Sequence, residues 1–314
     1  MSLSLKVSVI ICSLDGCRQG NVPRLLKQLV EQSLPEFEIL VVQGVSPCSK
    51  AHNDGVRSSK GEILVFLDDD VQLGDNMVIE NLVESVNCSD AIGIVGASQL
   101  IPGNSTRFQK HCAKELFRVQ SPIVNKLTES DMATHAAMAI SRRVYGEVGG
   151  EKEELLRTDD VYLRYMVGKK GYKIFLAPDT WVFHPPPTNI TSLLKGQFEN
   201  GIAYAHDYKY FPENVYYSPL DGDQLKFPKK SSYLLQIVRN LRILLCSLRN
   251  IHIFGLLSRL AIFLGVFWGL MHKRDWFKTW LLKSKKAERK ILMYQREPII
   301  SIYPMACMEL EVHL

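Results

Sequence analysis

The chain has 314 residues, of which 46% are hydrophobic and 23% charged, and this balance excludes an intrinsically disordered protein. Its length provides for one large domain or two modest ones. The seven cysteines are odd in number, widely spaced and without a C-x-x-C pair. This pattern argues against a disulfide framework and a zinc knuckle, and it favours a reducing compartment.

Charge is distributed unevenly along the chain. Residues 1–222 carry 22 Lys/Arg and 27 Asp/Glu, a net charge of −5, whereas residues 223–300 carry 16 and 4, a net charge of +12. The basic part is also rich in Leu, Ile, Phe and Trp. It is therefore expected to face anionic lipid, and no nucleic-acid partner is predicted.

The first 70 residues alternate between two apolar patterns. Short β-branched runs at residues 7–11, 37–42 and 62–67 predict buried strands, and residues 22–32 repeat Leu and Val at helical spacing. A second helical stretch lies before residue 62. This alternation predicts a doubly wound α/β sheet, whose ligands bind beyond the carboxyl ends of the strands.

A second cycle of elements follows. Residues 91–97 predict a strand, residues 159–170 a helix, and residues 172–176 and 180–183 two short strands. Pro185, Pro186 and Pro187 then stop regular structure. We place the end of this α/β domain, residues 1–222, near residue 222.

The C-terminal region, residues 223–314, is predicted to be helical and associated with a membrane. Residues 253–271 contain a single charge, Arg259, and are long enough to cross about 30 Å of hydrocarbon. An arginine deep in a bilayer costs about 2.5–3.5 kcal/mol. A helix that spans the bilayer and one that lies in its interface are both allowed.

Three consecutive acids, Asp68, Asp69 and Asp70, end an apolar strand. Carboxylates crowded at one strand end are stabilised by a hard divalent cation, and Mg²⁺ or Mn²⁺ takes oxygen ligands from carboxylates and phosphates together. The alternative is a polar turn in which an aspartate caps the next helix.

The order of motifs over most of the first 210 residues resembles the family 2 inverting glycosyltransferases of the GT-A fold. The resemblance rests on segments at residues 7–11, 25–29, 35–42, 51–55, 61–70, 138–150, 158–164 and on His184. It implies a nucleotide-sugar donor and a D-x-D site for Mn²⁺ or Mg²⁺, with Asp68, Asp70 and His184 as metal ligands. It further implies donor contacts from Cys12, Ser13, Asp15, Gln43, Asn53, Asp68 and Asp69.

Asp159 and Asp160 match the acidic motif that supplies the family's catalytic base. An acceptor hydroxyl must lose its proton as it attacks the anomeric carbon. Asp160 aligns with the motif's aspartate and is preferred, and Asp159 stays open. Two acids in the first turn of a helix also complement the helix dipole without any catalytic role.

Some positions depart from the family pattern. Gln43 stands where an acid usually reads the base, and its amide offers both a donor and an acceptor. His52 stands where arginine is frequent, and residues 197–201 lack Q-x-x-R-W, which favours a single addition over processive synthesis. Two alternatives to a transferase remain, a sugar-phosphate nucleotidyltransferase and a non-catalytic binding or scaffold subunit.

The resemblance and the basic apolar tail together predict an inverting hexosyltransferase on the cytoplasmic face of a membrane. Its expected acceptor is a lipid-linked or cell-envelope glycan precursor.

Overall fold

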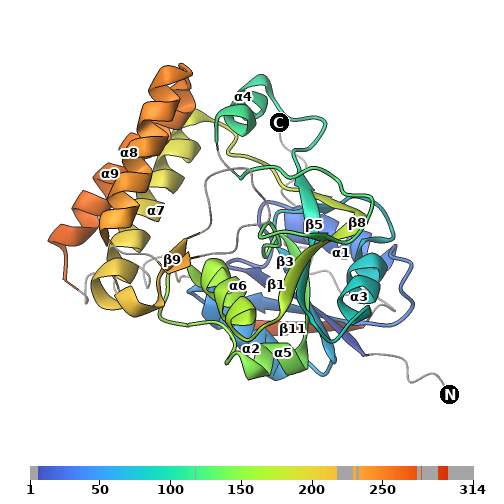
Figure 1. The fold of residues 1–314 in the computed structure, drawn as a ribbon. Helices are drawn as coiled ribbons and strands as arrows, with labels where there is room; N and C mark the ends of the chain where they lie inside the picture. The colour runs from blue at the N-terminus through green and yellow to red at the C-terminus, as the bar shows by residue number, and fades with distance from the viewer. Residues whose placement is uncertain are drawn as a thin grey trace.

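The computed structural model describes residues 6–116, 118–217, 229–230, 233–273, 277 and 289–295. A nine-stranded mixed sheet forms its centre, in the order β11-β2-β1-β3-β7-β5-β8-β4, with β6 also paired to β8 (Figure 1). Its strands are β1 (Val7–Ser13), β2 (Glu38–Gln43), β3 (Ile63–Asp68), β4 (Gln72–Leu73), β5 (Ile92–Leu100), β6 (Thr128–Glu129), β7 (Ala137–Ser141), β8 (Lys173–Phe183) and β11 (Lys290–Gln295). A separate small ladder joins β9 (Tyr216–Tyr217) to β10 (Lys229–Lys230).

Helices cover both faces of the sheet. They are α1 (Asn21–Val30), α2 (Cys48–Ser58), α3 (Val78–Asn87), α4 (Arg107–Glu115), α5 (Arg142–Glu147), α6 (Asp159–Lys169), α7 (Ile190–Tyr210), α8 (Tyr233–Arg249) and α9 (Ile253–Met271), with a 3₁₀ turn at Pro212–Asn214. Two hydrophobic cores result, one beneath α1 and α3 and the other beneath α2, α5 and α6. The predicted doubly wound architecture is confirmed.

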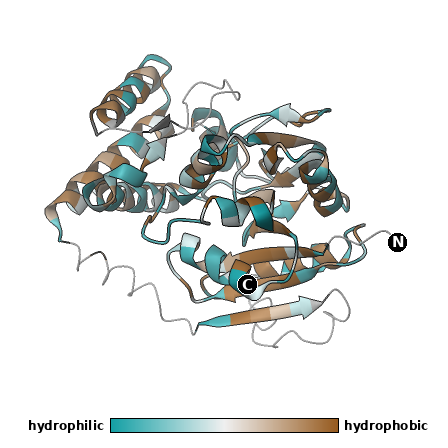
Figure 2. Cartoon of the chain, turned by 60° about the horizontal axis from the view of Figure 1, so that its bottom comes forward, coloured by the Kyte–Doolittle hydropathy of each residue, from teal (hydrophilic) through white to brown (hydrophobic). Residues whose placement is uncertain are grey.

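Apolar residues explain the central strands. Strands β2, β1 and β3 run parallel, and almost all of their side chains are buried because helices lie on both faces. These strands have hydrophobic colour along most of their length in Figure 2. Their carboxyl ends bring Ser13, Gln43 and Asp68 to one edge, where the chemistry was expected.

The second half of the sheet differs from the prediction in two places. The short strands expected at residues 172–176 and 180–183 are one continuous strand, β8. Residues 137–141, which carried no strand prediction, form β7, antiparallel to both β3 and β5. A five-residue apolar run is compatible with either a strand or a helix, so only its neighbours in the sheet decided this element.

Helices α7, α8 and α9 pack beside the sheet as a helical layer (Figure 1). The α7–α9 crossing is close because Gly201 and Gly265 face each other's helix without a Cβ atom. A methyl group on Gly265 would collide with the backbone oxygen of Phe198. Small residues therefore set the distance between these two helices.

The C-terminal region is only partly as predicted. Helices α8 and α9 confirm its helical character, but β11 is a strand that adds to the edge of β2. Arg289, just before it, donates to the carboxylate of Asp54 at 2.7 Å. Residues 289–295 of this region therefore lie against the central sheet. Several of the basic and tryptophan residues expected to contact lipid lie outside the described residues: Arg274, Trp276, Lys278, Trp280, Lys283, Lys285 and Lys286.

We expect Gly265→Ala to destabilise the protein by about 1–3 kcal/mol, because the added methyl group overpacks the α7–α9 crossing. Gly196→Ala on α7 is the matched control, since its methyl group meets nothing within 4 Å. There, alanine should stabilise the helix by up to about 1 kcal/mol. Thermal unfolding of both variants checks the prediction, and equal shifts of the same sign would contradict it.

Candidate active site

Asp68, Asp69 and Asp70, called here the acidic cluster, begin at the last residue of β3 and face the end of β8. Asp70 Oδ1 lies 3.2 Å from Nε2 of His184, the residue that follows β8 directly. The pairing of β4 with β8, which sets Gln72 opposite Phe183, brings the two segments together. Burial lowers the pKa of His184, but the hydrogen bond and charge of Asp70, with the charge of Asp68, raise it overall.

Arg18 also contacts the acidic cluster. Its guanidinium lies 3.1 Å from Asp70 Oδ2 and 3.6 Å from Asp69 Oδ1. Burial raises the pKa of Asp69 to about 6 despite this cation. Arg18 was not among the predicted site residues, because its position depends on the path of the loop after β1.

The acidic cluster fits a divalent cation in its chemistry. Asp70 Oδ2 contacts the Arg18 guanidinium, and Asp70 Oδ1 contacts the His184 imidazole. Carboxylate and imidazole are suitable ligands for Mn²⁺. Asp68 lies at the same edge, but the described residues form no three-ligand group there with all ligand atoms within 4.8 Å. Asp70 and His184 are therefore the pair that the structure brings together.

The loop after β1 is held by local hydrogen bonds. Asp15 Oδ1 accepts from the backbone of Cys17 and Arg18, and Gln43 Nε2 donates to the Asp15 carbonyl at 2.8 Å. Gly16 has φ of +71°, and a Cβ there would meet the Gln43 amide. Thus Gln43, expected at the nucleotide base, also fixes the loop that contains Ser13 and Asp15.

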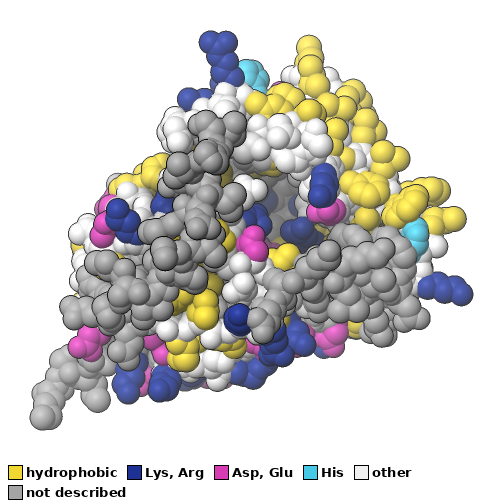
Figure 3. All heavy atoms as spheres, turned by 180° about the vertical axis from the view of Figure 1, so that it is seen from behind, with side chains coloured by type: hydrophobic (Ala, Val, Ile, Leu, Met, Phe, Trp, Pro, Cys, Tyr) yellow, Lys and Arg dark blue, Asp and Glu magenta, His cyan; other side chains and the backbone are white. Residues whose placement is uncertain are grey.

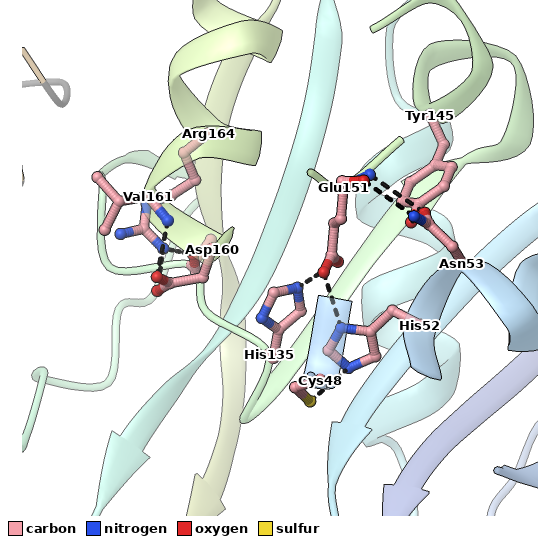
Figure 4. Close-up of polar contacts among 10 residues, drawn as sticks. Cys48, His52, Asn53, His135, Tyr145, Glu151, Asp160, Val161 and Arg164 are labelled. Atoms are coloured by element: carbon pink, nitrogen blue, oxygen red, sulfur yellow. Dashed lines mark hydrogen bonds and ion pairs between the residues drawn. The ribbon is translucent and has the colours of Figure 1, made fainter. Parts of the chain in front are cut away.

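Asn53, expected at the donor, is a buried residue of α2. Its Nδ2 donates to the Glu151 carbonyl at 2.9 Å, and its Oδ1 accepts from the Tyr145 hydroxyl at 2.6 Å (Figure 4). Asn53 therefore anchors the segment that contains Glu151.

Two histidines share the buried carboxylate of Glu151. His52 Nδ1 lies 3.0 Å from Glu151 Oε2, and His135 Nε2 lies 2.8 Å from Oε1 (Figure 4). Burial alone would raise the pKa of Glu151, but the two histidines lower it to about 2. Sequence reasoning missed Glu151 and His135, since no short motif joins residues 52, 135 and 151.

Asp159 and Asp160, the two candidates for the catalytic base, lie in different environments at the start of α6. Asp160 accepts from the buried guanidinium of Arg164 at 2.9 Å and from the Val161 backbone at 2.7 Å (Figure 4). Burial would raise its pKa, but the charge of Arg164 lowers it. The pKa of Asp159 is instead raised to about 6, first by burial and then by the charge of Glu151.

The acidic cluster lies near the group formed by Glu151, His52 and His135, at the same edge of the sheet. Leu67 of β3 pairs with Ala137 of β7, so Asp68, which follows Leu67, and His135, two residues before Ala137, approach the same edge. Asp159 belongs to this edge too, because a carboxylate oxygen of Asp159 lies within 4.8 Å of ring nitrogens of His52 and His135.

Asp207 of α7 supports the segment that leads into α6. Its buried carboxylate accepts from the backbone of Leu156 at 3.0 Å and from the Thr158 hydroxyl at 3.1 Å. The helical layer therefore fixes the position of Asp159 and Asp160.

A nearby hollow of about 850 Å³ lies between α2 and α5, lined in part by Asn53, Tyr145 and Glu151. None of Asp68, Asp70 and Asp159 lines it. The edge defined by hydrogen bonds and charge, rather than this hollow, is the candidate active site.

Comparison with known proteins agrees with this architecture. Residues 4–199 match the model of the glycosyltransferase like family 2, and the chain belongs to that family. No curated protein matches the chain.

Among solved structures, the chain is similar to the mannosyltransferase PcManGT from Pyrobaculum calidifontis in complex with GDP-Man and Mn²⁺. The TM-score is 0.53 at 13% identity, covering 84% of this chain and 86% of that one. Lower scores are found with GalNAc-T7 with UDP, GalNAc and Mn²⁺ (0.41, 14% identity, 59% and 44% covered) and S. aureus TarS (0.40, 14%, 81% and 55%). The fold is GT-A, as the motif order predicted.

Proposed function

We propose that the protein transfers a hexosyl group, with inversion, from a nucleoside-diphosphate sugar to an acceptor hydroxyl. One observation carries the proposal. At one edge of a family 2 fold, Asp70 lies beside His184 and Arg18, and Asp159 provides a carboxylate whose pKa is raised to about 6. A cation-binding carboxylate and a proton acceptor are the two groups that direct displacement needs.

Asp70 and His184 are the proposed ligands of Mn²⁺ or Mg²⁺, with Asp68 beside them. When bound, this ion neutralises charge on the departing diphosphate. Arg18 adds a second positive charge at the same place. Ser13, Asp15 and Gln43 shape the loop against which the nucleoside is expected to lie, with Cys12 on the strand below.

Asp159 is the proposed base, and Asp160 a positioning residue. A carboxylate with a pKa near 6 is ionised at neutral pH and is a stronger base than an ordinary aspartate. The ion pair with Arg164 weakens Asp160 as a base and commits one of its oxygens. The acceptor oxygen forms its bond to the anomeric carbon as its proton passes to Asp159 and the nucleoside diphosphate leaves.

A panel of UDP-, GDP- and dTDP-sugars, supplied with Mn²⁺ or Mg²⁺ and a polyprenyl-phosphate-linked sugar acceptor, tests the function. The expected result is release of the nucleoside diphosphate from one donor class together with a glycosylated acceptor. Pyrophosphate release from a nucleoside triphosphate and a sugar phosphate would indicate a nucleotidyltransferase. Tight donor binding with no turnover on any acceptor would favour the non-catalytic subunit.

We further propose that α8 and α9 attach the protein to an anionic membrane surface. Both helices expose apolar stripes at helical spacing: Leu234, Val238, Leu241, Leu245 and Leu248 on α8, and Ile253, Leu260, Leu264, Phe267 and Met271 on α9. Figure 3 shows hydrophobic side chains gathered on this side of the molecule. Nucleotide sugars are made in the cytosol, so the cytoplasmic face is the proposed location.

Among the described helices, only α9 is long and apolar enough to cross a membrane. In its most apolar stretch, 33% is buried inside the protein. Several features support an interfacial position instead. Its inner face packs along α7, which carries Lys195, Glu199 and Lys209, groups that are costly in hydrocarbon. Arg259 donates to Asn240 on α8 at 3.2 Å, so the only charge of α9 need not face lipid.

The membrane proposal predicts that the full chain sediments with vesicles containing phosphatidylserine and is released by alkaline carbonate. Leu264→Glu with Phe267→Glu should abolish sedimentation, because both side chains are more than 60% exposed and belong to the apolar stripe. Asn87→Glu on α3 is a control outside it. A protein released only by detergent would indicate a spanning helix, and one that never sediments would contradict attachment.

A further inference from the structure

Three ligand atoms that the proposed reaction does not use meet beneath the donor loop. They are Cys12 Sγ at the end of β1, and Cys48 Sγ and His52 Nε2 on α2, all within 4.8 Å of one another. Cys48 and His52 are four residues apart, so one turn of α2 places them on the same side of the helix. Cys12 joins them because it lies on the face of the sheet that α2 covers.

The spacing suits a tetrahedral metal. With Zn–S and Zn–N bonds of about 2.3 Å and 2.0–2.1 Å, the S···N edge of a tetrahedron is about 3.6 Å. The distance between Cys48 Sγ and His52 Nε2 is 3.6 Å. Three protein ligands leave a fourth position for water or another ligand, and Cys48 is an exposed residue.

Glu151 completes this arrangement from behind the histidine. A metal-binding imidazole usually gives its other nitrogen to a carboxylate, which fixes the tautomer and the orientation of the ring. His52 Nδ1 lies 3.0 Å from Glu151 Oε2, which directs Nε2 toward Cys48 (Figure 4). Asn53 and His135 hold Glu151 in turn.

We propose that Cys12, Cys48 and His52 bind one zinc ion that fastens the end of β1, and with it the donor loop, to α2. The site differs in chemistry from the acidic cluster, because thiolates select soft or borderline metals and carboxylates select Mg²⁺ or Mn²⁺. It does not depend on the proposed transferase activity. The two thiols lose their protons to solvent as the metal binds.

The test uses full-length, untagged protein, stripped by a chelator and kept reduced with a phosphine. Titration with Zn²⁺ against a chromophoric chelator should show one tight site, and Co²⁺ should give the charge-transfer absorption of thiolate ligands. Cys12→Ser and Cys48→Ser should each reduce that absorption, because one thiolate remains, and weaken Zn²⁺ at least about 100-fold. Glu151→Gln keeps all three ligands and should weaken Zn²⁺ about 10- to 100-fold.

Two controls separate this site from other metal binding. Cys88→Ser, which alters an exposed cysteine at the end of α3, should leave Zn²⁺ binding unchanged, and so should Asp70→Ala in the acidic cluster. Circular dichroism establishes that each variant is folded. The proposal is overturned if the folded Cys12→Ser and Cys48→Ser variants bind Zn²⁺ like the unaltered protein. A Co²⁺ complex without thiolate absorption, or a Cys12–Cys48 disulfide that persists in the phosphine, would overturn it as well.

Discussion

Replacement of Asp159 by Asn is expected to lower the rate of transfer by about 10²- to 10⁴-fold, the usual contribution of a general base. The dissociation constant of the donor should change little, because the loss affects the chemical step rather than ground-state binding. Single-turnover kinetics and donor titration on the same preparation measure the two quantities separately.

Asp160→Asn is the matched comparison, since it makes the same change, from carboxylate to amide, at the neighbouring residue. Its main expected effect is a lower melting temperature, because the buried Arg164 loses its anionic partner. The assignment within the pair would be reversed if Asp160→Asn abolished transfer at an unchanged melting temperature while Asp159→Asn stayed active.

The pH dependence follows from the same residue. Asp159 has a pKa raised to about 6, so the base is ionised above this pH and protonated below it. The transfer rate at saturating donor should therefore fall about tenfold for each unit that the pH drops below 6. An acid limb below the ordinary aspartate range would instead favour Asp160, whose pKa is lowered by the charge of Arg164.

The second large effect is expected at the acidic cluster. Asp70→Ala should weaken Mn²⁺-dependent binding of the nucleoside diphosphate at least about 100-fold, since even outer-shell partners of a metal contribute 10- to 100-fold. Calorimetry with UDP, GDP and dTDP, with and without Mn²⁺, measures this. Loss of the carboxylate also removes the partner of His184 and Arg18.

Asp90→Ala is the control for this experiment, because Asp90 is a fully exposed carboxylate in a 3.7 Å ion pair with Arg143. It should bind the diphosphate like the unaltered protein. Equal binding by the Asp70→Ala variant, or undiminished binding after chelation, would refute the metal role of the cluster.

The fold could largely be predicted from local sequence. The strands beginning at Val7, Glu38 and Ile63 are continuous apolar runs, and α1 has a clear helical period, so local pattern and global structure agree there. Strand β7 and strand β11 could not be predicted, because each is defined by the strand it pairs with.

The candidate site divides in the same way. Asp68, Asp70 and His184 lie at or just beyond the ends of predicted strands, where ligands bind in such sheets, and the resemblance to the family indicated them as metal ligands. The resemblance also indicated Asp159 and Asp160 and preferred Asp160, but the motif carries no information on the surroundings of each carboxylate. Their environments differ because Arg164 lies one helical turn beyond Asp160, whereas Asp159 lies near Glu151.

Only the tertiary structure assembled the groups that are far apart in the chain. Cys12, Cys48, His52 and Glu151 follow no metal-binding spacing, and their contact depends on the packing of α2 against β1 and of the loop after α5 against α2. The local pattern of the sequence predicts secondary structure and where each element ends. Burial, charge pairing and ligand geometry depend on which elements meet, and in this protein those contacts are the basis of the roles proposed for Arg18, Glu151 and Asp159.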